Sequence, residues 1–383
     1  MTSLRTLSTR SLAALIAVPV LATAGGVAAA RATSGSAAPP AAKALPAAIH
    51  DALAAPKPQG ISARISFTNH LIDSGALTGV GSPLLAGATG RLWASAAGLR
   101  LELQSPSGKD AQIVWRDRVL TVYDATQNTV YRFAAPPTSG AARTETGSRV
   151  PAVAQIQQAL TRIGQIWSLT GATPTTLANK PAYSLKLSPK HDGGLLGAVQ
   201  AVWDARSGVP LRASVYAAGT STPVLDVKAT SVHFGAVAAS DIAIAPPAGA
   251  KVVDLSSAVR RTRSKGAPAT RGAAPSVTAK ATLVGLPKVS DRTADWAGTP
   301  ARVLVYGHGL GAIVIVARTA DAASRTKDPL SALPTVSIAG ASGHELPTAL
   351  GTVLSLRRGS IQYLVLGSLP TVAAEAAARE FLS

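Results

Sequence analysis

The sequence predicts an α+β fold in two units, each built on an antiparallel sheet. The first observation is the stretch 91–133, where short runs alternate apolar and polar residues and turn residues end each run. Period-two alternation is typical of strands with one buried face, and the close punctuation indicates consecutive antiparallel strands. The second observation is an apolar stripe at helical spacing over 153–167. The third is a repeat of the strand pattern in 277–383, which ends in an Ala-rich helix.

Length and composition indicate an ordered chain with more than one domain. At 383 residues the chain favours two domains, and 47% hydrophobic residues suffice for real cores. The absence of cysteine excludes disulfides, thiolate metal sites, Cys nucleophiles and a lipid-modified N-terminal Cys.

The formal charge is +18, from 37 basic and 19 acidic residues. Without residues 1–32, which hold three of the basic residues and none of the acidic ones, it is +15. Such a surface attracts nucleic acid, anionic lipid or acidic polymers. No nucleic-acid motif occurs and the aromatic residues fall on predicted buried faces, so we expect no nucleic acid and favour an anionic cell envelope.

Residues 1–32 predict either a secretory signal peptide or an uncleaved membrane anchor. Arg5 and Arg10 precede an apolar run over 12–30, and small-residue cleavage candidates end it. The run is near the length needed to span a bilayer, which keeps the anchor open. Both readings place the rest of the chain outside the cytoplasm, secreted or attached to the membrane's outer face. No later stretch is long enough to cross a membrane.

A Pro- and Ala-rich linker over 33–44 precedes the first domain, 45–255. We expect a short helix over 46–55 and a half-buried strand over 61–71. The segment 74–90 holds five glycines beside several large apolar residues. It predicts either a hairpin loop tucked against the sheet or a mobile flap over an apolar cavity.

The rest of the first domain continues as one helix and more strands. The stripe over 153–167 predicts a helix that opens near Pro151 and packs on the sheet. Strands are expected at 183–187, 199–203 and 224–234. Between the last two, 202–212 predicts a hairpin in which Asp204 caps the turn and Gly208 takes positive φ.

A basic, acid-poor linker over 256–276 separates the second domain, 277–383. The linker is read as a solvated tether, or as a contact with anionic envelope material. In the second domain we expect strands 302–306 and 311–318 to pair with each other, and 352–356 with 360–367. Residues 371–382 close this small α+β domain as a helix.

Two stretches of the first domain carry a family resemblance. One is Ile113–Phe133, with Leu120-Thr-Val-Tyr-Asp124 and Asn128-Thr-Val-Tyr131; the other is the hairpin Asp204–Arg212. They resemble the LolA-like fold of periplasmic lipoprotein carriers and of RseB-type sigma-E regulatory proteins. The resemblance implies an incomplete, strongly curved antiparallel barrel covered by helices, with a cavity that takes acyl chains in the carriers.

The last domain resembles small C-terminal domains found on such proteins in actinobacteria, through Leu354–Leu369, and this implies no function. The sequence departs from the simple carrier in its basic linker and its extra domain. No charged cavity residue of the carriers can be placed on this chain.

Catalytic and metal sites are not predicted. The six histidines lack metal-ligand spacing with one another or with a carboxylate pair, and no nucleophile elbow occurs. The glycines of 307–311 resemble a phosphate loop, but the Lys-Ser/Thr ending is missing and a strand-like run follows, which favours a turn. We therefore expect no enzyme, no cofactor and no metal.

The main hypothesis is an exported lipid- or lipoprotein-binding carrier of the cell envelope whose partners are acyl chains. The residues predicted to contact the chain are Ile65, Phe67, Leu77, Leu84, Leu85, Leu101, Leu103, Trp115, Tyr123 and Trp203. The alternative is a regulatory or sensor protein of the RseB type that binds a membrane anti-sigma or other envelope protein. A third reading is a structural envelope protein held to anionic polymers by the basic linker.

Overall fold

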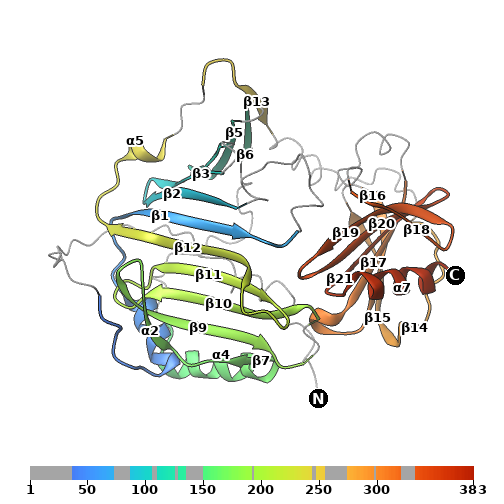
Figure 1. Cartoon of the computed structure of the whole chain (residues 1–383), viewed down its shortest axis with the longest axis horizontal. Helices are drawn as coiled ribbons and strands as arrows, with labels where there is room; N and C mark the ends of the chain where they lie inside the picture. The colour runs from blue at the N-terminus through green and yellow to red at the C-terminus, as the bar shows by residue number, and fades with distance from the viewer. Residues whose placement is uncertain are drawn as a thin grey trace.

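The computed structural model describes ten segments of the chain, namely 37–72, 87–105, 110–125, 128–134, 150–191, 194–243, 247–254, 274–296, 299–320 and 333–383. The predicted signal segment, most of the basic linker, and Leu77, Leu84 and Leu85 lie outside the described residues. Two antiparallel sheets organise the described chain, and few helices accompany them (Figure 1). This confirms the predicted α+β class with an additional C-terminal unit.

The first sheet has 13 strands and curls into a half-barrel (Figure 1). Its strands are β1 Gly60–Asn69, β2 Ala88–Ser95, β3 Gly98–Gln104, β4 Asp110–Arg116, β5 Val119–Asp124, β6 Thr129–Ala134, β7 Trp167–Leu169, β8 Thr173–Leu177, β9 Lys180–Pro189, β10 Leu196–Asp204, β11 Pro210–Ala217, β12 Pro223–Phe234 and β13 Lys251–Asp254. The order is β13-β6-β5-β4-β3-β2-β1-β12-β11-β10-β9-β7, and β8 also pairs with β9. All pairs are antiparallel except β13 with β6.

The pairing of β1 with β12 joins the two meanders of this sheet. It places Ile65 opposite Ala229 and Phe67 opposite Val227, residues far apart in sequence. The register shifts between Arg64 and Ile65, which marks a bulge at the centre of the sheet. Bulges increase the local twist and bend of a strand, so this one contributes to the curvature.

The predicted hairpin between β10 and β11 is confirmed. Asp204 Oδ1 accepts hydrogen bonds from the backbone N–H groups of Arg206 (3.1 Å) and Ser207 (2.7 Å). Gly208 has φ of 68°, and a Cβ there would lie 2.2 Å from the carbonyl oxygen of Ala52. The turn therefore packs directly against α2, Leu45–Ala54, which is the short helix predicted near the N-terminus.

The helix α4, Val153–Ile166, forms where predicted but lies elsewhere than expected. It contacts α2 and the edge strand β7 instead of covering the sheet. Only Ile156 is fully buried, and Ile166 keeps 62% of its surface exposed. An apolar stripe predicts that a helix packs on something, but not which surface it meets.

The second sheet has eight strands and a single long helix, α7, Thr371–Leu382. Its strands are β14 Thr282–Leu283, β15 Leu286–Trp296, β16 Thr299–Tyr306, β17 Ile313–Thr319, β18 Thr335–Ile338, β19 Ala341–Thr348, β20 Gly351–Arg358 and β21 Ile361–Gly367. They follow the order β14-β15-β16-β17-β21-β20-β19-β18. The predicted pairs β16–β17 and β20–β21 are both antiparallel.

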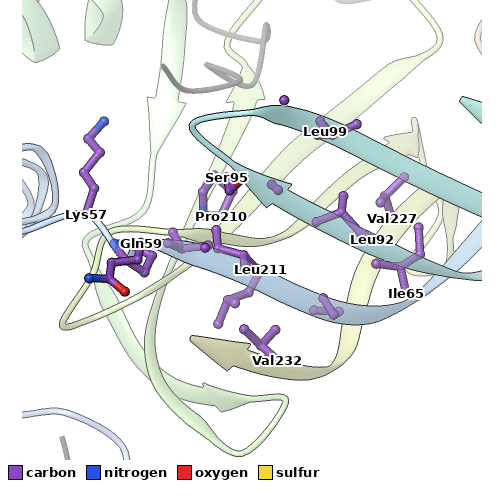
Figure 2. Close-up of a pocket in the computed structure, with 18 of the residues that line it drawn as sticks. Lys57, Gln59, Ile65, Leu92, Ser95, Leu99, Pro210, Leu211, Val227 and Val232 are labelled. Atoms are coloured by element: carbon purple, nitrogen blue, oxygen red, sulfur yellow. The ribbon is translucent and has the colours of Figure 1, made fainter. Parts of the chain in front are cut away.

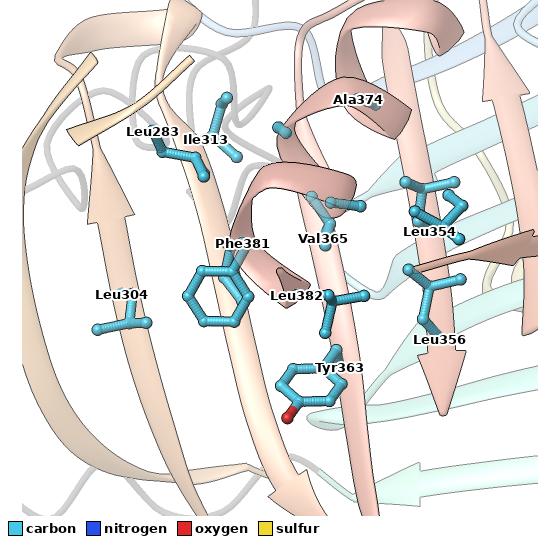
Figure 3. Packing of buried hydrophobic residues seen from close by; sticks show 14 of the residues in the cluster. Leu283, Leu304, Ile313, Leu354, Leu356, Tyr363, Val365, Ala374, Phe381 and Leu382 are labelled. Atoms are coloured by element: carbon cyan, nitrogen blue, oxygen red, sulfur yellow. The ribbon is translucent and has the colours of Figure 1, made fainter. Parts of the chain in front are cut away.

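This second sheet and α7 enclose a continuous core (Figure 3). Phe381 from the helix lies against Tyr363 of β21, with ring centroids 6.0 Å apart in an edge arrangement. Leu304, Leu354 and Leu356 are fully buried around them. The half-barrel differs, because its buried apolar residues form small separate clusters of three or four residues. The side chains of the half-barrel therefore fill the space beside their sheet less completely than those of the second sheet do.

Backbone hydrogen bonds connect the two sheets. The N–H of Leu195, just before β10, donates to the Ser368 carbonyl oxygen (3.2 Å) and to its Oγ (2.9 Å). The N–H of Ala349 donates to the Leu71 carbonyl oxygen at 2.8 Å, just beyond β1. Among the described residues, no helix combines the length and hydrophobicity that a membrane crossing requires.

Candidate apolar ligand pocket

An apolar pocket of about 230 Å³ lies on one face of four neighbouring strands, β2, β1, β12 and β11 (Figure 2). Alternate residues in the middle of β1 and β2 line it, whereas β11 contributes the consecutive residues 210–213. The lining consists mostly of Ile61, Ala63 and Ile65 from β1, Leu92 and Ala94 from β2, Leu99 from β3, Leu211 and Ala213 from β11, and Val227, Ala229 and Val232 from β12. The register explains this grouping, since Ala63 faces Leu92 on one side and Val232 on the other.

Small side chains create the space. Alanines occupy β1, β2, β11 and β12 at positions 63, 94, 213 and 229, where larger residues would fill the concave side of the bend. Val227 remains 42% exposed although it lies in the middle of a central strand. A large aliphatic side chain exposed beside an apolar hollow indicates a surface that a ligand covers.

The polar groups of the pocket lie at its margin. Lys57, Gln59 and Ser95 line one end, and Lys57 extends away from the hollow (Figure 2). Arg212 also borders the pocket, but its guanidinium is bound elsewhere. Its Nε donates to Asp226 Oδ1 at 2.7 Å and its second terminal nitrogen to Oδ2 at 3.2 Å. The hydrogen bond with Asp226 raises the pKa of Arg212, so this cation is committed to a protein carboxylate.

The structure brings several predicted contact residues to the pocket face. Ile65 lines the pocket. Leu103 is buried against Ile65 and Ala88, and Leu101 packs on the same small cluster. Phe67 follows on β1, opposite Val227 of the pocket wall. Trp115 of β4 faces Leu99, which lines the pocket, so it extends the same face outward.

Two predicted residues lie apart from this group. Tyr123 faces Gln112 and Val130, in the opposite alternation to Leu103, and its hydroxyl bonds Asn128 Oδ1 at 3.2 Å. It therefore lies on the other face of the sheet. Trp203 packs with Tyr183 at 6.0 Å between ring centroids, beside α2. The predicted flap residues Leu77, Leu84 and Leu85 lie outside the described residues.

Sequence reasoning missed other lining residues, chiefly Leu92, Leu99, Leu211 and Val232. The alternation of β2 and β3 contains the signal for the first two, because Leu92 faces Leu101 and Leu99 faces Ala94. Leu211 and Val232 had no local signal. Their place follows from the long-range pairing of β12 with β1, which no periodicity reveals.

Within the described residues, no group of three or more His, Asp or Glu side chains is arranged to hold a metal ion. His344 Nδ1 lies 3.2 Å from the Leu333 carbonyl oxygen, so this ring has a structural partner. The arrangement offers apolar contact and shape, without a cluster of reactive groups around the pocket.

The described chain is thus a curved antiparallel half-barrel with an apolar pocket, followed by a smaller sheet with one packed helix. No protein-family model matches the sequence, and no curated protein matches it either. Solved structures similar to this chain include the MucA/MucB complex of Pseudomonas aeruginosa, at 14% identity and a TM-score of 0.39, covering 87% of this chain and 95% of that one.

A LolA superfamily protein from Nitrosomonas europaea is also similar, at 12% identity and a TM-score of 0.21. It covers 53% of this chain and 99% of its own. The Nitrosomonas europaea protein belongs to the superfamily that residues 113–133 and 204–212 of this chain resemble in sequence.

Proposed function

We propose that this protein is an extracytoplasmic carrier that holds an acyl chain in the pocket between β1, β2, β11 and β12. The observation that carries the proposal is the pocket itself, lined by aliphatic side chains on the concave face of a bent sheet. Its volume of about 230 Å³ lies below the ~300–1,000 Å³ typical of small-molecule sites. It therefore suits a segment of one chain better than a whole lipid.

Apolar burial alone provides a modest driving force for such binding. At about 25 cal/mol per Å², burying ~200 Å² of chain surface contributes about 5 kcal/mol. Without any opposing cost this corresponds to a Kd of about 0.2 mM, and the loss of translational and rotational freedom weakens it, so millimolar or weaker affinity is expected for a segment of this size. No cationic partner is required, which agrees with the engagement of Arg212 by Asp226.

Native mass spectrometry of protein purified from its host tests the proposal directly. We expect a mass excess that disappears on organic extraction, and a lipid in the extract. Protein that is empty by this measurement and also fails to bind a fluorescent fatty acid would contradict the carrier role. Capture of one membrane-spanning envelope protein, with no lipid, would instead favour the sensor reading.

A further inference from the structure

We propose that the outer face of β2, β1 and β12 binds the surface of an anionic phospholipid bilayer. Arg64, Arg91 and Lys228 lie on this face. Each sits between two residues that belong to the pocket face. Arg64 lies between Ala63 and Ile65, and Lys228 between Val227 and Ala229. Because side chains alternate along a strand, the three cations point away from the pocket.

The register places these cations next to one another. Arg64 faces Arg91 directly across the β1–β2 pair, and Lys228 faces Ser66, two residues further along β1. Opposed residues of neighbouring strands have Cβ atoms about 5 Å apart, so the two arginines repel each other. An anion bound above them relieves that repulsion.

The neighbouring acids are already paired. Glu102, opposite Arg91, forms an ion pair with Arg100. Asp226 accepts hydrogen bonds from Arg212 and from Ser214 Oγ at 2.6 Å. Within the described residues, Arg64, Arg91 and Lys228 make no ion pair. The face thus carries three unneutralised cations, and both arginines are exposed.

The form of this face favours a bilayer over a discrete ligand. The residues around the cations are small and polar, including Ser66, Thr89 and Ser231, so the cations are the longest side chains among these neighbours. At its border Trp93 is half-buried beneath Arg100, whose guanidinium carbon lies 5.5 Å from the ring centroid. Partly exposed tryptophan side chains are common at membrane interfaces. The apolar run over 12–30 also takes this chain to a membrane in either reading of residues 1–32.

Flotation of the full chain with vesicles tests the proposal. Binding to vesicles of phosphatidylcholine alone is compared with binding to vesicles that contain about 30% phosphatidylglycerol. The ratio of the two affinities is the gain in membrane binding due to the anionic lipid. The variant R64Q/R91Q/K228Q should lose about a hundredfold of that gain at low salt, since each cation near the surface contributes about fivefold. The matched control R162Q/R292Q/R379Q removes the same charge elsewhere and should lose much less.

Each other outcome overturns the proposal. These outcomes are no gain with anionic vesicles, an equal loss in the control variant, or binding to soluble polyglutamate as strong as binding to anionic vesicles. Because the pocket opens on the other face, binding of a fluorescent fatty acid without vesicles should be the same in all variants. Failure of membrane binding and failure of the carrier role are therefore separate results.

Discussion

Arg212 and Asp226 form a two-pronged ion pair across β11 and β12, the two strands whose other face lines the apolar pocket. The Asp226 carboxylate is almost fully buried, at 6% exposure, and Ser214 adds a third hydrogen bond to it. This pair fixes the register of the two strands at the pocket wall.

Replacing Asp226 with Ala should destabilise the protein by about 3 kcal/mol, because it leaves Arg212 without its partner in a half-buried position. Urea unfolding measures the change. Asp51→Asn breaks an exposed ion pair with Lys43 and serves as the comparison, with little change expected. Similar losses from both variants would show that the buried pair has no special role.

Gly208→Ala should destabilise the half-barrel by about 2–3 kcal/mol. Gly208 has φ of 68°, and an added Cβ would collide with the Ala52 carbonyl oxygen. The collision would push the β10–β11 hairpin away from α2, and the backbone strain of a positive φ adds to this cost. Gly219 also has positive φ, at 76°, but nothing lies within 4 Å of a Cβ there. Gly219→Ala should therefore show only the backbone strain, about 1 kcal/mol. Equal effects would mean that the contact with α2 contributes nothing.

Glu345→Gln should stabilise the protein at neutral pH. Burial, followed by the nearby charge of Glu375, raises the pKa of Glu345 above its usual 4.5. Its Oε1 lacks a hydrogen-bond partner in the described structure. Because the pKa of this carboxyl is higher in the folded protein than in the unfolded chain, the folded state is relatively more stable at pH values below the unfolded pKa. This stability is lost as the pH rises through the folded pKa and the buried carboxyl ionises.

The variant and the parent should therefore unfold alike below about pH 4.5 and diverge above it, with the variant more stable. Thermal unfolding over a pH series measures this. Asp117→Asn, at a side chain that is 84% exposed, removes the same charge and should leave the profile unchanged. A parent that matches Glu345→Gln at pH 7 would refute the account of this carboxyl.

The pairing of Asp291 with Arg302 should make the stability of the protein depend on pH in the opposite direction. The hydrogen bond from Arg302, with a smaller one from Lys288, lowers the pKa of Asp291 from 3.8 to about 2 against the opposing effect of burial. Because the pKa of Asp291 is lower in the folded protein than in the unfolded chain, the ionised carboxylate stabilises the fold at pH values above the unfolded pKa. This stability disappears as the pH falls toward the folded pKa of about 2. Asp291→Asn should be modestly less stable than the parent at pH 7, and the gap should close between pH 3.8 and about 2. A gap that stays constant over that range would argue against the pairing.

Local pattern predicted four of the eight described strands of the second sheet, and its helix. The Ala-rich run over 371–382 predicts a helix, and α7 spans Thr371–Leu382 directly after Pro370. The hairpin around Asp204 was also predictable, since turn chemistry depends on neighbouring residues alone.

The pocket was predictable only in part. Alternation predicts that Ile65, Leu101 and Leu103 each lie on an apolar face of their strand, and the structure places them on the same face. Alternation within one strand does not tell which residues of the next strand share that face, because this depends on the register across the turn. The alternation within β5 therefore does not reveal that Tyr123 lies on the opposite face of the sheet from Leu103. The β1–β12 pairing and the position of α4 depend on contacts between distant segments, which no local pattern contains.

The central claim is that the pocket beside Ala213 binds an acyl chain. Its most direct test is fluorescent fatty-acid titration of Ala213→Phe, which places a ring in the pocket from an exposed position, against Ala159→Phe on the exposed side of α4. The account predicts a roughly tenfold or greater loss of affinity for Ala213→Phe and none for Ala159→Phe. Equal affinity for the two variants, both folded, would contradict it.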